Sequence, residues 1–133
     1  MTFVGTVAKR FAAALAAIAC ASAHAATLRV GPNETFTRIA DAAKAAKDGD
    51  IVEILPGEYR GDVATWRQKK LLIRGIGERP VLIADGKIEQ GKAIWVIADG
   101  DILIDNIEFR GARAADENGA GIRFERGRLE VRN

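Results

Sequence analysis

The chain is poor in the residues that carry most enzyme chemistry. Its 133 residues include one cysteine, one histidine, one methionine and one tyrosine, and aromatic residues make up 6%. Cys20 and His24 both lie within the segment 1–25, so the segment 26–133 contains no thiol and no imidazole. For that segment, the sequence excludes a disulfide, a thiol nucleophile and histidine-based proton transfer or metal binding.

The segment 26–133 also lacks an excess of charge of either sign. The whole chain has 20 basic and 18 acidic residues. Lys9 and Arg10 lie in the segment 1–25, which contains no Asp or Glu, so 18 basic and 18 acidic residues remain. Nucleic-acid-binding domains normally show a basic excess, so this balance predicts that nucleic acid is not a partner.

The N-terminal segment, 1–25, shows the three-part pattern of a secretory signal peptide. Two basic residues precede an almost unbroken apolar run, residues 11–23, and Ala23-His24-Ala25 supplies the small residues that a signal peptidase reads. The run is too short for a permanent membrane span, and no second one follows. We expect a secreted or periplasmic protein of residues 26–133. The less favoured alternative is a lipoprotein anchored at Cys20, because Ala17 stands where leucine is usual.

The segment after the signal peptide predicts a short strand followed by a helix. Residues 27–30 predict a strand that ends at the turn Gly31-Pro32-Asn33. Residues 35–47 place apolar side chains at the spacing of an amphipathic helix, with Thr35 as its N-cap. Asp48-Gly49 ends this helix, because glycine tolerates the left-handed conformation that follows a helix end.

Beyond Asp50, short apolar runs alternate with glycine-containing turns, which indicates a β-sandwich, a β-barrel or a solenoid. The predicted strands are residues 51–55, 71–74, 81–83, 94–97, 102–105, 107–109, 122–124 and 129–131. Arg60-Gly61-Asp62 spells a cell-adhesion tripeptide, but we interpret it as an ordinary turn.

Two neighbouring strands repeat together, which favours the solenoid. Residues 93–97 align with 121–125 at an offset of 28, and 102–106 align with 129–133 at an offset of 27. An earlier copy starts at Leu71, and a weaker one starts at Val52. This alignment predicts two interior columns, one of Ile94, Val96, Ile122 and Phe124 and one of Ile102, Ile104, Leu129 and Val131. Each coil needs a neighbour to bury such a column.

Two asparagines fall at the same corner of successive coils. Asn106 and Asn133 follow the second strand of each aligned pair. Stacked asparagines at a bend can hydrogen-bond backbone groups that would otherwise be buried without partners. With only two copies, coincidence is the alternative.

The cap and first coil resemble a known family. Gly31-Pro32, then Phe36-Thr37-Arg38-Ile39-Ala40-Asp41-Ala42, then Asp48-Gly49-Asp50-Ile51-Val52-Glu53-Ile54-Leu55-Pro56-Gly57-Glu58-Tyr59 are similar to the start of right-handed parallel β-helix proteins of the pectin lyase-like group. The resemblance covers residues 28–133. It implies an all-β fold, a right-handed parallel β-helix solenoid with a short N-terminal capping α-helix. Because residues 129–133 read as the middle of a strand, we expect residues 26–133 to be the cap and first coils of a solenoid that is incomplete at its C-terminus.

The resemblance also implies a function. Relatives include pectin and pectate lyases, polygalacturonases, alginate-modifying enzymes and phage tailspike hydrolases, so we expect a protein that binds or acts on acidic polysaccharide. A complete enzyme would be a lyase, with Ca²⁺ or arginine neutralising a uronate while an Arg or Lys removes the adjacent proton, or else a glycoside hydrolase. The family's catalytic residues lie on middle coils, so none is assigned and this segment alone is expected to be inactive. The alternative is a non-catalytic surface adhesin or envelope scaffold.

Candidate substrate-binding residues surround the longest turn, residues 111–119. This turn leads into the strand on which Arg123 points outward, and the alignment places Trp95 beneath Arg123 on the preceding coil. An exposed aromatic ring beside a guanidinium, Asp116 and Glu117 could stack on and pair with a uronate. The alternative is a solvent-facing strand with a Trp–Arg cation–π contact.

Three aspartates invite a calcium interpretation, because the resemblance implies Ca²⁺ in a full-length protein. Calcium needs six to eight oxygens around one point. Asp99, Asp101 and Asp105 lie in a turn and along one strand, so they need not converge, and we interpret them as turn and surface residues. No metal or cofactor is expected in this segment.

Overall fold

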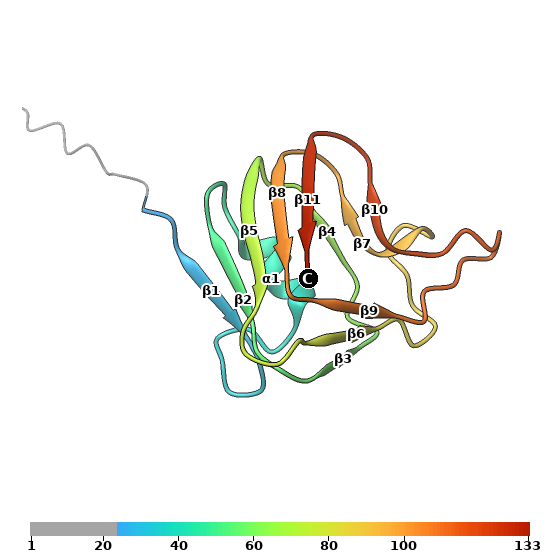
Figure 1. The fold of residues 1–133 in the computed structure, drawn as a ribbon, viewed down its shortest axis with the longest axis horizontal. Helices are drawn as coiled ribbons and strands as arrows, with labels where there is room; N and C mark the ends of the chain where they lie inside the picture. The colour runs from blue at the N-terminus through green and yellow to red at the C-terminus, as the bar shows by residue number, and fades with distance from the viewer. Residues whose placement is uncertain (1–23) are drawn as a thin grey trace, which may run out of the picture.

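The computed structural model describes residues 24–133, so the predicted signal peptide, with Cys20 and Ala23, lies outside the described residues apart from His24 and Ala25. Eleven strands in the described segment form three sheets in which every pair of neighbouring strands is parallel (Figure 1). One helix accompanies them. This arrangement is a parallel β-solenoid of about four turns, and it confirms the all-β fold with a short helix.

From β2 onward, the chain visits the three sheets in the same order on each turn. Sheet A contains β1 (Thr27–Val30), β2 (Ile51–Ile54), β5 (Lys70–Gly75), β8 (Asp101–Asp105) and β11 (Arg128–Arg132). Sheet B contains β3 (Glu58–Arg60), β6 (Val81–Ile83) and β9 (Glu108–Arg110). Sheet C contains β4 (Ala64–Trp66), β7 (Ala93–Ile97) and β10 (Ala120–Phe124). The single helix, α1 (Ile39–Ala45), lies between β1 and β2 in the chain.

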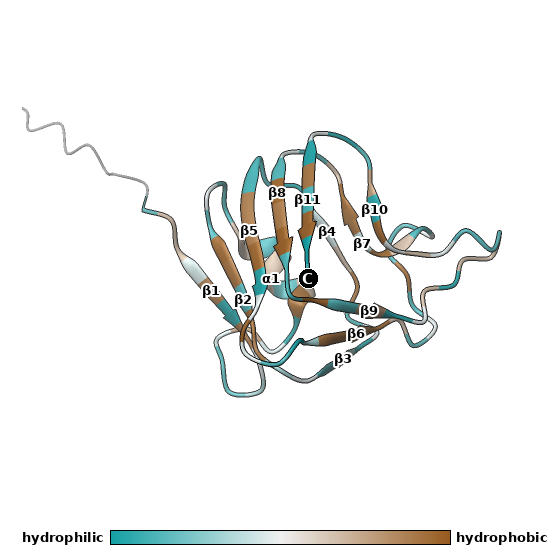
Figure 2. Cartoon of the chain, viewed as in Figure 1, coloured by the Kyte–Doolittle hydropathy of each residue, from teal (hydrophilic) through white to brown (hydrophobic). Residues whose placement is uncertain are grey.

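Sheet A has the pairing that the repeat predicts, although Val131 of the predicted interior column is 54% exposed. Ile102 pairs with Leu129 and Ile104 with Val131, and the two isoleucines are buried. One detail of the alignment is wrong: Val52 pairs with Ile73 rather than with Leu71. An error of two positions keeps Val52 on the inner face, because side chains on a strand alternate with period two. Figure 2 shows hydrophobic residues concentrated on strands such as β5, β7 and β8.

In sheet C the predicted register is wrong by one position. Trp95 pairs with Ile122, at an offset of 27, where the repeat predicted Ile94. A slip of one position exchanges the two faces of a strand. The Trp95 ring therefore lies in the interior, with its centroid 5.2 Å from that of Trp66 and 5.1 Å from that of Phe109. Ile94 and Val96, predicted to point inward, alternate with Trp95 on the strand and are nonetheless buried.

Strands β3 and β4 were not predicted. They consist of Glu58-Tyr59-Arg60 and Ala64-Thr65-Trp66, each with one or two apolar side chains next to polar ones. Gly61 and Asp62 lie between the two strands. Strands this short carry little periodic signal. Their pairing with β6 and β7 is set by the next coil rather than by their own composition.

Helix α1 begins later and ends earlier than predicted, with an extended Ala46 rather than Asp48-Gly49 after its last residue, and a residue from another coil caps its start. Arg38 occupies the N-cap position without a side-chain hydrogen bond, and Thr35 is not the cap. The buried Asp62 carboxylate instead accepts hydrogen bonds from the backbone N–H groups of Ile39 (2.6 Å) and Ala40 (2.9 Å). Asp62 thus satisfies two of the donors that a helix start leaves free. Residues 60–62 lie where the chain turns from β3 to β4, and Asp62 gives this turn a structural role.

The predicted asparagine corner is present. Asn106 and Asn133 both adopt left-handed backbone conformations, with φ of 59° and 57°, after the paired strands β8 and β11. The Asn106 amide donates hydrogen bonds to the carbonyl oxygens of Gly75 (3.0 Å) and Gly77 (3.1 Å) on the preceding coil. Asn133 donates to the Asp105 carboxylate at 2.9 Å. Asparagine suits this corner because it tolerates the left-handed region.

Candidate functional site

A hollow of about 470 Å³ lies where the loop 111–119 meets sheet C. Its lining residues come from three places: the turn before β7, the loop 111–119 between β9 and β10, and β10 itself. They are Gly91, Lys92, Asp116, Asn118, Ala120 and Arg123. We call this hollow the loop pocket. It lies at one edge of the solenoid wall, where two successive coils contribute side chains.

The loop beside this pocket is folded back on itself. The Asn118 N–H donates to the Asp116 carboxylate at 3.1 Å, and the Glu117 N–H donates to the Ala114 carbonyl at 3.0 Å. A side chain at Gly119 would place its Cβ 2.6 Å from the Arg113 Cα, so only glycine fits this close approach. The loop therefore presents Asp116 from a defined turn rather than from an extended tether.

Two cations of the loop pocket converge on one carboxylate. The Lys92 Nζ lies 2.9 Å from Glu125 Oε1, and the Arg123 Nε lies 3.6 Å from the same oxygen. All three side chains remain partly exposed, so solvent screens these ion pairs. Lys92 precedes β7 and Arg123 lies on β10, so parallel pairing of these strands is what brings the two positive charges together.

Both carboxylates of this region are held in the ionised form. The Asn118 backbone N–H, and then its side chain, lower the pKa of Asp116. The hydrogen bond from Lys92 lowers the pKa of Glu125, and the charges of Lys92 and Arg123 add to this effect. Ionised carboxylates accept hydrogen bonds from hydroxyl groups but have no proton to donate near neutral pH. The geometry therefore suits ligand binding better than general acid catalysis.

The structure brings together two of the four residues proposed as substrate contacts. Asp116 and Arg123 line the loop pocket, whereas Glu117 does not and has a left-handed backbone with φ of 65°. The expectation of an exposed Trp95 is wrong, because its side chain is 0% exposed and packs inside the solenoid. Trp95 therefore cannot stack on a sugar. The cause is the register: Ile122, not Arg123, is its partner on β10.

Sequence reasoning missed Lys92 and Asn118 as pocket residues and did not assign Glu125 a role there. A signal for Lys92 was available, because the offset of 27 that holds for sheet A would have placed Lys92 opposite Gly119, at the end of the long loop. The backbone confirms this proximity, since the Ala120 N–H donates to the Lys92 carbonyl at 3.2 Å.

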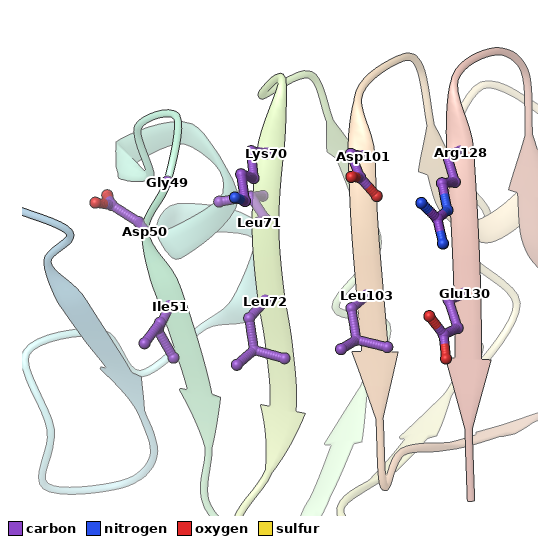
Figure 3. Close-up of a pocket in the computed structure, with 10 residues that line it drawn as sticks. All are labelled: Gly49, Asp50, Ile51, Lys70, Leu71, Leu72, Asp101, Leu103, Arg128 and Glu130. Carbon is purple, nitrogen blue, oxygen red and sulfur yellow. The ribbon is translucent and has the colours of Figure 1, made fainter.

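A second hollow, of about 400 Å³, lies on the outer face of sheet A (Figure 3). Leu72 and Leu103 lie side by side on its floor, and Lys70, Asp101 and Arg128 follow one another along one edge. Positive and negative side chains alternate here from strand to strand. This differs from the loop pocket, where two cations share one anion.

The three aspartates considered for calcium do not form a cluster. Asp99 accepts a hydrogen bond from the Gly100 N–H at 2.8 Å, while Asp101 and Asp105 lie at opposite ends of β8. Among the residues that the structure describes, no group of three or more His, Cys, Asp and Glu is arranged to hold a metal ion. Calcium in a longer protein stays a prediction. Within the same residues, no helix is long and apolar enough to cross a membrane.

The fold and its surface define the class of protein as a parallel β-solenoid with a capping helix. Comparison of the chain with protein-family models, with characterised proteins and with solved structures yields no match. The solenoid fold therefore stands on the structure, and the pectin lyase-like assignment stays a resemblance of the cap and first coil.

Proposed function

We propose that this protein is an exported solenoid that binds acidic polysaccharide at the loop pocket. The observation that carries the proposal is the convergence of Lys92 and Arg123, from successive coils, on a single carboxylate oxygen of Glu125. A uronate carboxylate has the same charge and geometry as the Glu125 side chain. It can exchange with Glu125 as the partner of both cations, because charge-assisted hydrogen bonds to a guanidinium or ammonium group are strong and directional.

The remaining pocket residues suit the rest of a sugar. Asp116 is ionised and accepts hydrogen bonds from hydroxyl groups, and Asn118 offers both a donor and an acceptor. The resemblance implies Arg or Lys as the base of a lyase. Here Lys92 and Arg123 both pair with Glu125, so binding rather than bond cleavage is the function that these contacts support.

The test is a titration of the purified protein with polygalacturonate and with neutral dextran at low ionic strength, followed by calorimetry. We expect binding to polygalacturonate only. Replacing Arg123 by alanine should weaken it about tenfold, because one charge-assisted hydrogen bond contributes roughly 1.5–3 kcal/mol and tenfold corresponds to about 1.4 kcal/mol. The matched control is Arg110→Ala, because Arg110 is equally exposed (56% against 55%) and also pairs with a glutamate, but on sheet B.

A second variant tests the exchange with Glu125 directly. Glu125→Gln removes the internal competitor while leaving both cations in place, so polygalacturonate should bind several-fold more tightly. Equal affinity for dextran and polygalacturonate, or an equal loss in the Arg123 and Arg110 variants, would refute the proposal. Absence of binding to either glycan would favour the non-catalytic scaffold.

A further inference from the structure

The outward side chains of sheet A alternate in sign from strand to strand. Parallel pairing stacks them into rows that run along the solenoid. One row, near the strand starts, is Lys70, Asp101 and Arg128 on β5, β8 and β11. The other row is Arg29, Glu53, Arg74, Asp105 and Arg132 on β1, β2, β5, β8 and β11. In both rows, every charge has only opposite charges on the strands beside it.

An apolar row lies between these two charged rows. It runs through Ile51, Leu72 and Leu103 and ends at Glu130 on β11 (Figure 3). The three apolar side chains are only partly buried, and they form the floor of the hollow on this face. Sheet A therefore presents an apolar strip with charged edges, and nothing else in the described residues covers it.

The alternation decides which kind of partner fits. A uniformly charged polymer such as a polyuronate would be attracted by one strand and repelled by the next, so it cannot match this face. A matching surface needs the same spacing between strands, about 4.8 Å, with the signs reversed. The same face of a second copy has this property when β5 of one copy lies opposite β8 of the other.

We propose that sheet A is the interface of a symmetric dimer of this protein. Place a two-fold axis parallel to the strands and midway between β5 and β8. Strand β5 of one copy then faces β8 of the other, so that Lys70 faces Asp101 and Arg74 faces Asp105. In the apolar row, Leu72 faces Leu103. Such an interface is self-complementary, as two-fold symmetry requires.

The outer strands fit the same axis. Strand β2 faces β11 of the second copy, which places Glu53 opposite Arg132. Two positions lack a match there. Ile51 meets Glu130 in the apolar row, and Arg128 meets no charge because the first charged row has no member on β2. An axis perpendicular to the strands would instead place Lys70 of one copy opposite Arg74 of the other, so the charges select one arrangement over the other.

The size of the face predicts a weak dimer. Four strands overlap under this axis, and at about 4.8 Å apart, each contributing about five residues at about 3.3 Å, they span roughly 320 Å² per copy. The sum over both copies is smaller than the area of stable complexes, which bury about 1200 Å² or more, and such small interfaces belong to transient complexes. Because its edges are charged and exposed, the association should weaken as salt rises.

The first test is sedimentation velocity of the purified protein over a range of concentrations up to about 1 mM. In about 20 mM NaCl the sedimentation coefficient should rise toward that of a dimer, and in about 500 mM NaCl it should stay at the monomer value. An unmodified protein that stays monomeric at every concentration in low salt would overturn the proposal.

The second test is a charge exchange between two exposed positions, Lys70 and Asp101. Asp101→Lys alone and Lys70→Asp alone each place like charges face to face, so each variant should be monomeric. Mixed together they should dimerise again, because Lys70 of the first variant meets Asp101 of the second, and the two introduced residues also have opposite signs. The matched control is Glu58→Lys, which changes the charge equally on sheet B and should dimerise normally.

Rescue in the mixture cannot come from an effect on folding of either variant alone. A mixture that stays monomeric, or a Glu58→Lys variant that loses dimerisation as Asp101→Lys does, would show that association occurs elsewhere, for example at the last coil, where Phe124 and Val131 are 42% and 54% exposed.

Discussion

Replacing Asp62 tests a contact of this structure that the sequence did not predict, the capping of α1 by a residue from another coil. Its carboxylate is buried and accepts two hydrogen bonds from the start of α1, at 2.6 and 2.9 Å. Asp62→Ala leaves both N–H groups without a partner. A buried donor left unsatisfied costs about 1–3 kcal/mol, so two cost about 2–6 kcal/mol, and loss of the charge at the helix start adds about 0.3–1 kcal/mol. We therefore expect a loss of roughly 2–7 kcal/mol.

Two further variants show which part of the Asp62 interaction matters. Asp62→Asn keeps one oxygen acceptor but loses the charge, so its loss should be smaller, about 1–3 kcal/mol. The matched control is Asp41→Ala, which removes an exposed carboxylate from the first turn of the same helix. An exposed charge near a helix start contributes about 0.3–1 kcal/mol, so this variant should change stability little.

The assay is urea unfolding followed by the fluorescence of Trp66 and Trp95, which are both buried and should report loss of the core. Linear extrapolation then gives the free energy of unfolding. If Asp62→Ala lost less than about 1 kcal/mol, the buried hydrogen bonds would not be stabilising as argued. If Asp41→Ala lost as much as Asp62→Ala, the charge alone would explain the effect.

Three other predictions concern the corners and one buried phenol. Asn106→Ala should lower the free energy of unfolding in urea by roughly 2–3 kcal/mol, because it removes the hydrogen bond to the Gly75 carbonyl and places alanine in a left-handed conformation. Asn106→Gly should lose only the hydrogen bond, because glycine adopts that conformation without strain. Equal losses in the two variants would contradict this. Gly100→Ala should prevent cooperative unfolding, since its Cβ would collide with the Gln68 carbonyl oxygen; a normal transition would refute this close packing. Burial raises the pKa of Tyr59, so the contribution of its neutral phenol to stability is complete below the pKa of the unfolded state and is lost as pH rises through the pKa of the folded state. If a Tyr59→Phe variant lost the same stability at alkaline pH, Tyr59 would not be the cause.

How far the sequence predicts the structure differs between the sheets. On sheet A, charged residues at both ends of an apolar run mark the outer face, as in Lys70-Leu71-Leu72-Ile73-Arg74, and two isoleucines of β8 were correctly placed inside. On sheet C, Ala93-Ile94-Trp95-Val96-Ile97 is apolar throughout and buried throughout. A run that is apolar on both faces does not reveal which face is interior. The prediction of an exposed Trp95 failed for this reason.

The candidate site was predictable only in part, for a similar reason. Arg123 and Asp116 could be found because Arg123 lies on an evident strand and Asp116 lies in the glycine-bounded segment 111–119 that leads into it. Lys92 lines the pocket because of the register of β7 with β10, and the sequence predicted this register wrongly by one position. The cap of α1 was not predictable from local sequence either, because Asp62 lies 23 positions beyond Ile39 and only the winding of the chain brings them together.

The two charged faces should act independently, because the same parallel pairing arranges their charges in opposite ways. At the loop pocket, Lys92 and Arg123 share Glu125, so a ligand carboxylate can replace a carboxylate of the protein. On sheet A, each cation has an anion beside it, as Arg74 has Glu53 at 2.7 Å, so a free anion gains little there. Arg123→Ala should therefore weaken glycan binding without changing dimerisation, and Asp101→Lys should do the reverse. Loss of both properties in either variant would mean that one surface performs both roles.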